Sequence, residues 1–279
     1  MNQQTQDSDL KEPLLLYYPC MKEDFTTPKS SSYFFSLIDR EGTIDIKRSF
    51  VSSPPRWLTI IIRLGLFGWS TASIILGAFT DHDKYFYLAY LTNCTAIISL
   101  GYQCVSAFVS ILPDKITQPK KEKDSPPCII KTMWILYSIA APAETAIVFL
   151  FWTFDYKQSV DGPVRYCMVF EHGILASLIL IDGTIIGRIP LRRIHCICVI
   201  TYMSIYFAWN VMFSRFFVEE SSPIYDVLDW RNDFIFAAFL VFLIIAIVSP
   251  VSFLFCWMLS IRKRRYLSND DVEVQQVAI

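Results

Sequence analysis

The sequence has few charged residues for its length. Only 18% of its 279 residues are Asp, Glu, Lys or Arg, whereas soluble globular domains usually contain about 25%. The formal net charge is −1, so there is no bulk basic field of the kind that attracts nucleic acid. These deficits argue against a soluble protein and against a nucleic-acid partner.

The sequence also lacks a CxxC pair with metal-ligand spacing. Most of its eight cysteines lie inside or at the ends of apolar runs, where cysteine behaves as a small hydrophobic residue. We therefore expect neither a disulfide framework nor a metal or other cofactor. Residues 1–11 have no apolar core and do not form a signal peptide. No fixed-period repeat and no inverted pair of broken helices is evident, which argues against common transporter architectures.

Long apolar runs separate the few clusters of charge, and 53% of the residues are hydrophobic. A run of about 20 apolar residues crosses the bilayer as a helix, because its backbone polar groups must bond within the segment. The sequence therefore predicts an all-α integral membrane protein with six transmembrane helices in one domain, residues 57–261. We expect a disordered N-terminal tail, residues 1–56, and a C-terminal tail, residues 262–279. The predicted spans are Trp57–Phe79, Phe86–Ile111, Ile129–Phe154, Arg165–Gly187, Ile194–Phe217 and Phe234–Ile261.

Lysine and arginine in the connections set the orientation of such proteins, because their excess lies on the cytosolic side. Fourteen lie on the side of the two termini and five on the other. We therefore expect both termini in the cytosol, of either the plasma membrane or an endomembrane. The fourteen are Lys47, Arg48, Arg56, Lys115, Lys120, Lys121, Lys123, Arg188, Arg192, Arg193, Arg262, Lys263, Arg264 and Arg265, and the five are Lys84, Lys157, Arg165, Arg215 and Arg231.

Ionisable residues within the apolar runs are costly, at about 2.5–3.5 kcal/mol or more each. Arg63 lies early in the first span and Asp182 lies near the end of the fourth. At a rise of 1.5 Å per residue, both are roughly 8–9 Å from the cytosolic edge. We interpret them as a buried structural ion pair that joins these two helices.

A second group of polar residues lies at a depth of roughly 9–11 Å below the outer surface. It consists of Thr92 in the second span, His172 in the fourth and Asn210 in the fifth, with Glu144 of the third slightly deeper. A neutral histidine can act as general base to a hydroxyl nucleophile. Thr92 and His172 are therefore candidate catalytic residues, and Glu144 or Asn210 could orient the histidine. The alternative is that these groups form interhelical hydrogen bonds.

Several motifs between residues 55 and 232 resemble the rolling stone family of multi-pass membrane proteins. That family usually has an aromatic residue where this chain has Cys94, so the chain resembles a divergent member. The motifs are Pro55-Arg56-Trp57 with Arg63, Tyr90-Leu91-Thr92-Asn93, His172-Gly173, Leu180-Ile181-Asp182, Arg188-Ile189-Pro190 with Arg192 and His195, and Ile224-Tyr225-Asp226-Val227-Leu228-Asp229-Trp230.

Rolling stone proteins are distantly similar to the androgen-induced family of membrane hydrolases, which cleave fatty acid esters of hydroxy fatty acids with an intramembrane threonine and histidine. This similarity implies that Thr92 is a nucleophile and His172 its base. Rolling stone itself is associated with myoblast fusion, without an assigned reaction. Two functions therefore stay open: a hydrolase acting on a membrane lipid ester, and a non-enzymatic protein of cell fusion, adhesion or scaffolding. A transporter or channel ranks third, because a transport path would need more intramembrane charges than the sequence has and the Arg63–Asp182 pair is interpreted as structural.

The hydrolase hypothesis makes a geometric demand. The Thr92 and His172 side chains must lie within hydrogen-bond reach, about 2.6–3.2 Å. They must also adjoin an apolar pocket that can take an acyl chain. The side chains at a suitable depth to line that pocket are Met168, Phe170, Phe207 and Trp209.

Overall fold

A computed structural model of the protein describes residues 34–35, 38–39, 42–43, 46–51, 54–80, 84–117, 125–156, 165–217, 225 and 227–261. Six helices within this part of the chain are long and apolar enough to span a membrane. The chain is therefore an all-α multi-pass membrane protein, as its apolar runs predicted. All six helices belong to one compact unit. The predicted C-terminal tail and most of the N-terminal tail lie outside the described residues.

The first three spans are nearly continuous helices. They are α2 (Arg56–Thr80), α3 (Leu91–Ile111) and α5 (Cys128–Leu150), the last of which ends in the π-helical turn η4 (Phe151–Asp155). The shorter elements beside them are the antiparallel pair β1 (Ile38–Asp39) and β2 (Gly42–Thr43), the π turn η2 (Lys47–Val51), the 3₁₀ helix η3 (Lys84–Ala89) and α4 (Asp114–Thr117).

The last three spans are more irregular. The fourth consists of α7 (Tyr166–Val169), the π turn η5 (Phe170–Ile174), α8 (Leu175–Leu180) and the π turn η6 (Ile181–Ile186). The fifth is the 3₁₀ turn η7 (Arg193–His195) followed by α9 (Cys196–Phe216). The sixth is α10 (Phe234–Leu243), the π turn η8 (Ile244–Val248) and helical residues 249–261.

The second span begins later than the sequence predicted, at Leu91 rather than Phe86. Tyr90 has an extended backbone, with φ −86° and ψ 133°, and it separates η3 from α3. The Asn93 side-chain amide donates to the carbonyl of Tyr87 at 2.9 Å, which holds the 3₁₀ turn against the start of the helix. Thr92 therefore lies in the first turn of α3.

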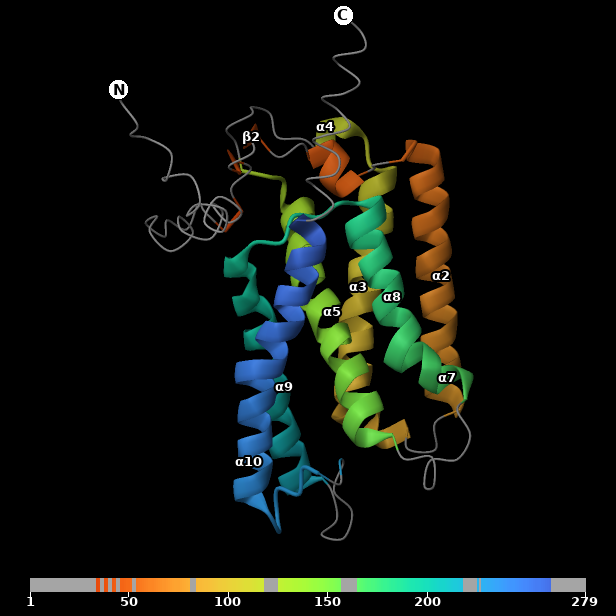
Figure 1. The fold of residues 1–279 in the computed structure, drawn as a ribbon. Coiled ribbons are helices and arrows are strands. Elements are labelled where there is room, and N and C mark those ends of the chain that lie inside the picture. The colour runs from red at the N-terminus through yellow and green to blue at the C-terminus, as the bar shows by residue number, and fades with distance from the viewer. Residues whose placement is uncertain are drawn as a thin grey trace, which may run out of the picture. The chain divides into compact units, whose positions relative to one another are not determined.

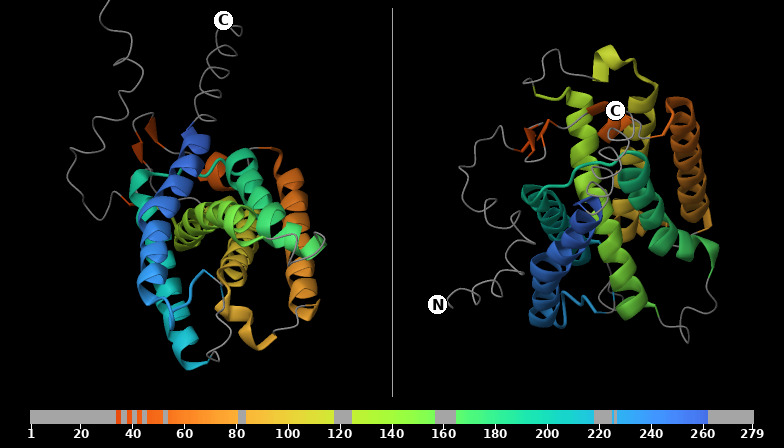
Figure 2. Two further views of the ribbon diagram at one scale, coloured as in Figure 1. Left: turned by 60° about the horizontal axis from the view of Figure 1, so that its bottom comes forward. Right: turned by 45° about the horizontal axis from the view of Figure 1, so that its top comes forward.

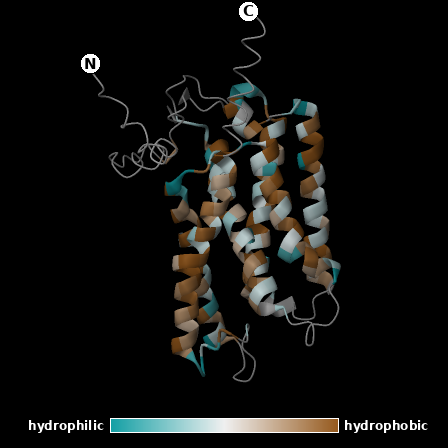
Figure 3. Cartoon of the chain, viewed as in Figure 1, coloured by the Kyte–Doolittle hydropathy of each residue, from teal (hydrophilic) through white to brown (hydrophobic). Residues whose placement is uncertain are grey.

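Helices α3 and α5 pack against each other at the centre of the bundle (Figures 1 and 2). The buried alanines of α5, including Ala140, Ala141 and Ala143, allow this close approach. Helices α2, α7 and α8 lie on one side of the central pair, and α9 and α10 lie on the other. Large apolar side chains face outward, and α10 is coloured as hydrophobic along most of its length in Figure 3. This surface suits contact with lipid.

The predicted ion pair is present. Arg63 Nε donates to Asp182 Oδ1 at 2.7 Å, and each residue is only 1% exposed. The second carboxylate oxygen accepts from the Tyr102 hydroxyl at 2.6 Å and from the Ser106 hydroxyl at 2.7 Å. Asp182 therefore joins α3 and the first span as well as its own helix. We call this end of the bundle, where Arg56 also lies, the basic end.

The segment before the first helix is partly folded, although the sequence predicted a disordered tail up to residue 56. Phe50 and Val51 of η2 are fully buried. Their carbonyls accept from Arg63 Nη1 at 2.8 and 3.1 Å, and the Phe50 ring lies edge-on to Trp134 at 5.2 Å. The buried guanidinium has more donors than Asp182 can satisfy, so it also binds these backbone carbonyls.

Candidate functional site

Thr92 and His172 lie side by side near the end of the bundle opposite the basic end. The Thr92 Oγ1 atom is 3.2 Å from His172 Nε2. His172 lies in η5, where its φ of −109° and ψ of 22° depart from helical values. Such π turns often mark functional sites in helices. The distance meets the geometric demand that the sequence set for a nucleophile and its base.

The other ring nitrogen of His172 determines the tautomer. Its Nδ1 atom lies 3.0 Å from the carbonyl oxygen of Met168. A carbonyl can only accept, so Nδ1 carries a proton and donates it to this bond. In the neutral ring, Nε2 is then unprotonated and accepts from the Thr92 hydroxyl. This is the tautomer that a general base needs.

Two aromatic residues of η4 fix the position of His172. The Phe151 ring stacks on the imidazole, with 3.5 Å between the ring centroids and 19° between the planes. The Trp152 indole N–H donates to the His172 carbonyl at 2.7 Å. Sequence reasoning did not single out Phe151 or Trp152, and it considered Met168 only as a side chain that could line the pocket. The only available signal was the aromatic run at the end of the third span, residues 149–154.

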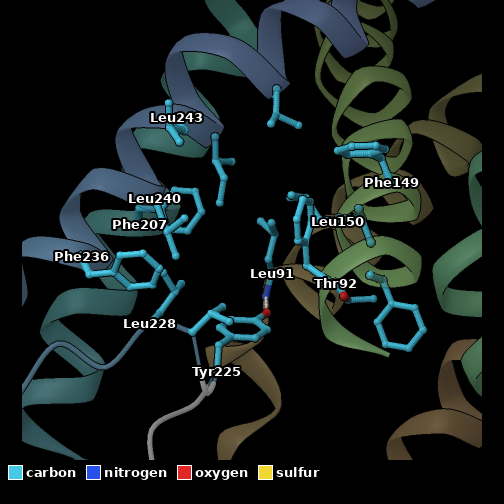
Figure 4. A pocket seen from close by; sticks show the side chains of 16 residues that line it. Leu91, Thr92, Phe149, Leu150, Phe207, Tyr225, Leu228, Phe236, Leu240 and Leu243 are labelled. Atoms are coloured by element: carbon cyan, nitrogen blue, oxygen red, sulfur yellow. Dashed lines mark hydrogen bonds between the residues drawn. The ribbon is translucent and has the colours of Figure 1, made fainter. Parts of the chain in front are cut away.

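Thr92 also forms part of the wall of an apolar pocket of about 420 Å³ (Figure 4). The pocket lies between the start of α3, the end of α5, α9 and the sixth helix. Among the described residues that line it, only Thr92 and Tyr225 carry a polar group, and none is charged. Its volume is within the usual range for small-molecule sites, about 300–1,000 Å³.

The prediction of which residues line the pocket was mostly wrong. Only Phe207 does so. Phe170 is fully buried and packs near the Trp69 ring, with 6.2 Å between centroids. The Trp209 indole N–H donates to the Leu88 carbonyl at 3.1 Å. Residues two apart point to nearly opposite sides of a helix, so Phe207 and Trp209 could not both face one cavity. The fourth predicted residue, Met168, supplies the carbonyl that holds His172.

Glu144 and Asn210 have partners other than His172. Glu144 Oε1 accepts from the Ser99 hydroxyl at 2.6 Å. Asn210 Oδ1 accepts from the indole N–H of Trp230 at 2.8 Å. The group that accepts a hydrogen bond from His172 Nδ1 is therefore a backbone carbonyl. The sequence had suggested that one of these two side chains would orient the histidine.

Comparison of the chain with models of known protein families, with curated protein sequences and with solved structures gave no match. Within the described part of the chain, no group of three or more His, Cys, Asp or Glu side chains is placed to hold a metal ion. The site is therefore interpreted from its own geometry.

The Leu228-Asp229-Trp230 motif shapes one wall of the pocket. Leu228 lines it directly, and Trp230 anchors the connection to Asn210 of α9. Asp229 Oδ1 accepts from the backbone N–H groups of residues 232 and 231 at 2.9 and 3.0 Å, which forms a tight turn before α10. These bonds, with the one from the residue 232 N–H foremost, lower the pKa of the Asp229 carboxyl. The motif thus positions the start of the sixth helix beside the pocket.

Proposed function

We propose that the protein is a membrane-embedded hydrolase of lipid esters, with Thr92 as the nucleophile and His172 as the general base. The observation that carries this proposal is that the pocket, the Thr92 hydroxyl and the His172 ring are adjacent to one another. Thr92 lines an apolar pocket, and its hydroxyl lies 3.2 Å from His172 Nε2. The resemblance to rolling stone proteins, and through them to a family of membrane hydrolases, supports the same two residues.

The first half-reaction transfers the acyl group to the protein. The Thr92 oxygen attacks the ester carbonyl carbon while His172 Nε2 takes the hydroxyl proton. The tetrahedral adduct then collapses, the carbon–oxygen bond to the alcohol breaks, and His172 returns the proton to the leaving oxygen. The Met168 carbonyl accepts from Nδ1–H throughout, so its dipole stabilises the positive charge on the ring.

The second half-reaction releases the acid. A water molecule attacks the Thr92 ester while His172 Nε2 takes one of its protons, and the proton returns to the Thr92 oxygen as the fatty acid leaves. Both steps create a negatively charged oxygen beside the start of α3. The first backbone N–H groups of a helix have no carbonyl partner within it. In this turn the Leu91 N–H donates to the Tyr225 hydroxyl at 2.8 Å and the Cys94 N–H donates to the Tyr90 carbonyl at 3.2 Å, so the N–H groups of Thr92 and Asn93 are the candidate donors to that oxygen.

A fluorophosphonate probe tests the proposal, because it reacts covalently with an activated hydroxyl nucleophile. We expect the wild-type protein to be labelled and Thr92→Ala to lose labelling. Replacing His172 with Gln should slow labelling by about 10²–10⁴-fold, the usual contribution of a general base. Thr145→Ala is the matched control, because the Thr145 hydroxyl bonds the Ala141 carbonyl of its own helix at 2.8 Å and should leave labelling unchanged.

The non-enzymatic alternative, a role in cell fusion, adhesion or scaffolding, predicts a different result. It requires no activated hydroxyl, so wild-type and Thr92→Ala proteins should be equally unreactive. Size-exclusion chromatography in detergent should accompany each measurement, so that loss of labelling is compared only among folded proteins. Equal labelling of wild-type protein and of Thr92→Ala would remove Thr92 as the nucleophile.

A further inference from the structure

The pocket beside Thr92 is elongated along one side of the sixth helix. Figure 4 shows Phe236, Leu240 and Leu243 following one another along that helix, away from Tyr225. Ile244 and Val248 of η8 continue the same wall. From residue 236 to residue 248 the helix rises roughly 18 Å at 1.5 Å per residue. The pocket is therefore a channel with a hydroxyl near one end and branched aliphatic side chains at the other.

The length and lining of this channel suit a hydrocarbon chain. A pocket of about 420 Å³ that extends roughly 18 Å along the sixth helix has room for an extended acyl chain. The absence of charge among the described lining residues also excludes a charged headgroup from the interior.

The far end of the channel is formed by residues of one helical side. Leu240, Ile244 and Val248 are four residues apart and share a face of the sixth helix. Ile247, one residue before Val248, does not line the pocket and is 52% exposed. The two neighbours therefore offer a pocket-facing position and a surface position at almost the same depth.

We infer that the channel holds the acyl chain of a straight-chain fatty acyl ester, and that Ile244 and Val248 set the chain length that fits. The inference rests on the proposed hydrolase function, because it places the ester carbonyl at Thr92. The chain then lies along the sixth helix with its methyl end between Ile244 and Val248. A bulkier side chain at either position shortens the space, and a smaller one lengthens it.

The test measures binding and hydrolysis separately. Binding uses photoactivatable octanoate and palmitate on the full-length Thr92→Ala protein, which cannot turn over an ester but keeps the pocket. Hydrolysis uses the nitrophenyl esters of octanoate, laurate and palmitate on protein with Thr92 intact. We expect palmitate to crosslink to the peptide that contains residues 240–248. Val248→Phe should reduce palmitate crosslinking and cleavage about tenfold while octanoate is affected less than twofold.

Two further variants control for misfolding. Ile247→Phe adds the same side chain one residue away on the exposed surface and should leave both chain-length profiles unchanged. Ile244→Ala enlarges the far end and should raise the activity toward palmitate relative to octanoate. If Val248→Phe elutes as an aggregate, the Ile244→Ala profile alone decides the question, since an unchanged ratio would contradict the assignment.

The outcomes separate this inference from the proposed function. Crosslinking outside residues 240–248, or chain-length profiles that are the same in all variants, would overturn the acyl-chain assignment even if Thr92-dependent hydrolysis occurs. Length-dependent crosslinking without any Thr92-dependent hydrolysis or probe labelling would instead overturn the proposed enzyme and leave a fatty-chain binding site.

Discussion

At the residue scale, the Thr92–His172 pair differs from a Ser-His-Asp triad in its third group. A carboxylate in that position both selects the histidine tautomer and stabilises the charged ring. Here the Met168 carbonyl selects the tautomer with a bond of 3.0 Å. It carries only a partial charge, so it stabilises the imidazolium less. A carboxylate buried in the membrane would itself be costly, and the carbonyl avoids that cost.

The Arg63–Asp182 ion pair gives the first stability prediction. Asp182→Ala should leave the buried guanidinium without its carboxylate, at a cost of about 3–5 kcal/mol. The free energy of unfolding in detergent, followed by denaturant titration of tryptophan fluorescence, measures this loss. The double variant Arg63→Leu with Asp182→Leu should recover part of it, because neither charge remains. A double variant as unstable as the sum of the two single changes would show that the residues are not coupled.

Recovery in that double variant should be incomplete for a reason that the structure makes visible. The Tyr102 and Ser106 hydroxyls both donate to Asp182, and they lose their acceptor when it becomes leucine. Two buried hydroxyls without partners each cost about 1–3 kcal/mol.

Much of this residue-scale arrangement followed from depth alone. Equal depth correctly brought Arg63 to Asp182 and Thr92 to His172. Depth says nothing about which side of a helix faces inward, so Trp209 was wrongly placed in the pocket. It also cannot identify a backbone partner, because every residue has a carbonyl, and so the role of Met168 was missed.

At the element scale, the six spans were predictable because hydropathy is averaged over a whole helix. The last four begin and end within one residue of the prediction, and the first two differ from it only at their start. The π turns were not predictable, because one inserted residue hardly changes that average. The π turns nevertheless contain residues of the candidate site, the ion pair and the pocket. His172 lies in η5, Asp182 lies in η6, and the far end of the pocket is η8.

Close packing of α5 against η6 gives a second stability prediction. A Cβ atom at Gly183 would clash with Cε2 of the buried Tyr137 ring. Gly183→Ala should therefore force these helices apart, and overpacking of this kind usually costs about 1–3 kcal/mol. Gly68→Ala is the control, because nothing lies within 4 Å of its added Cβ. Thermal unfolding midpoints in detergent should fall for Gly183→Ala only, and equal midpoints would contradict the packing.

The η2 turn gives a third stability prediction. Phe50 is fully buried against Trp134 although it precedes the first span. Phe50→Ala should remove this contact, and a buried phenylalanine usually contributes about 3–5 kcal/mol. Trp57→Ala serves as the control because Trp57 is 64% exposed at the start of α2. Only Phe50→Ala should be cleaved faster in limited proteolysis and have a lower thermal unfolding midpoint. Similar behaviour of the two variants would mean that η2 does not contribute to stability.

At the scale of the whole molecule, one face of α3 connects the two polar centres. Thr92 lies at its start beside His172, Ser99 bonds Glu144 near its middle, and Ser106 bonds Asp182 closer to the basic end. These residues are seven apart, so they share a side of the helix. The polar groups of the bundle are thereby gathered around its central helix, and the outer surface stays apolar.

The arrangement of six spans leads to the last prediction, which concerns topology. An even number of crossings places the two ends of the membrane domain on the same side. Among the described residues, Lys47, Arg56, Arg188 and Arg192 precede or follow spans on that side, and an excess of such residues marks the cytosol. Epitope tags at both termini should therefore bind antibody only after the membrane is permeabilised.

A tag inserted between α9 and α10, at residues 218–224, tests the opposite side in the same experiment. α9 ends at Phe216 and α10 begins at Phe234, so this connection lies five crossings from the N-terminal tag. In protein at the plasma membrane, the inserted tag should bind antibody on intact cells while both terminal tags do not. For protein retained in an endomembrane, protease added to sealed vesicles should remove the terminal tags and spare the inserted one. A C-terminal tag that is exposed on intact cells, with the N-terminal tag protected, would require an odd number of crossings and would contradict the six-helix topology.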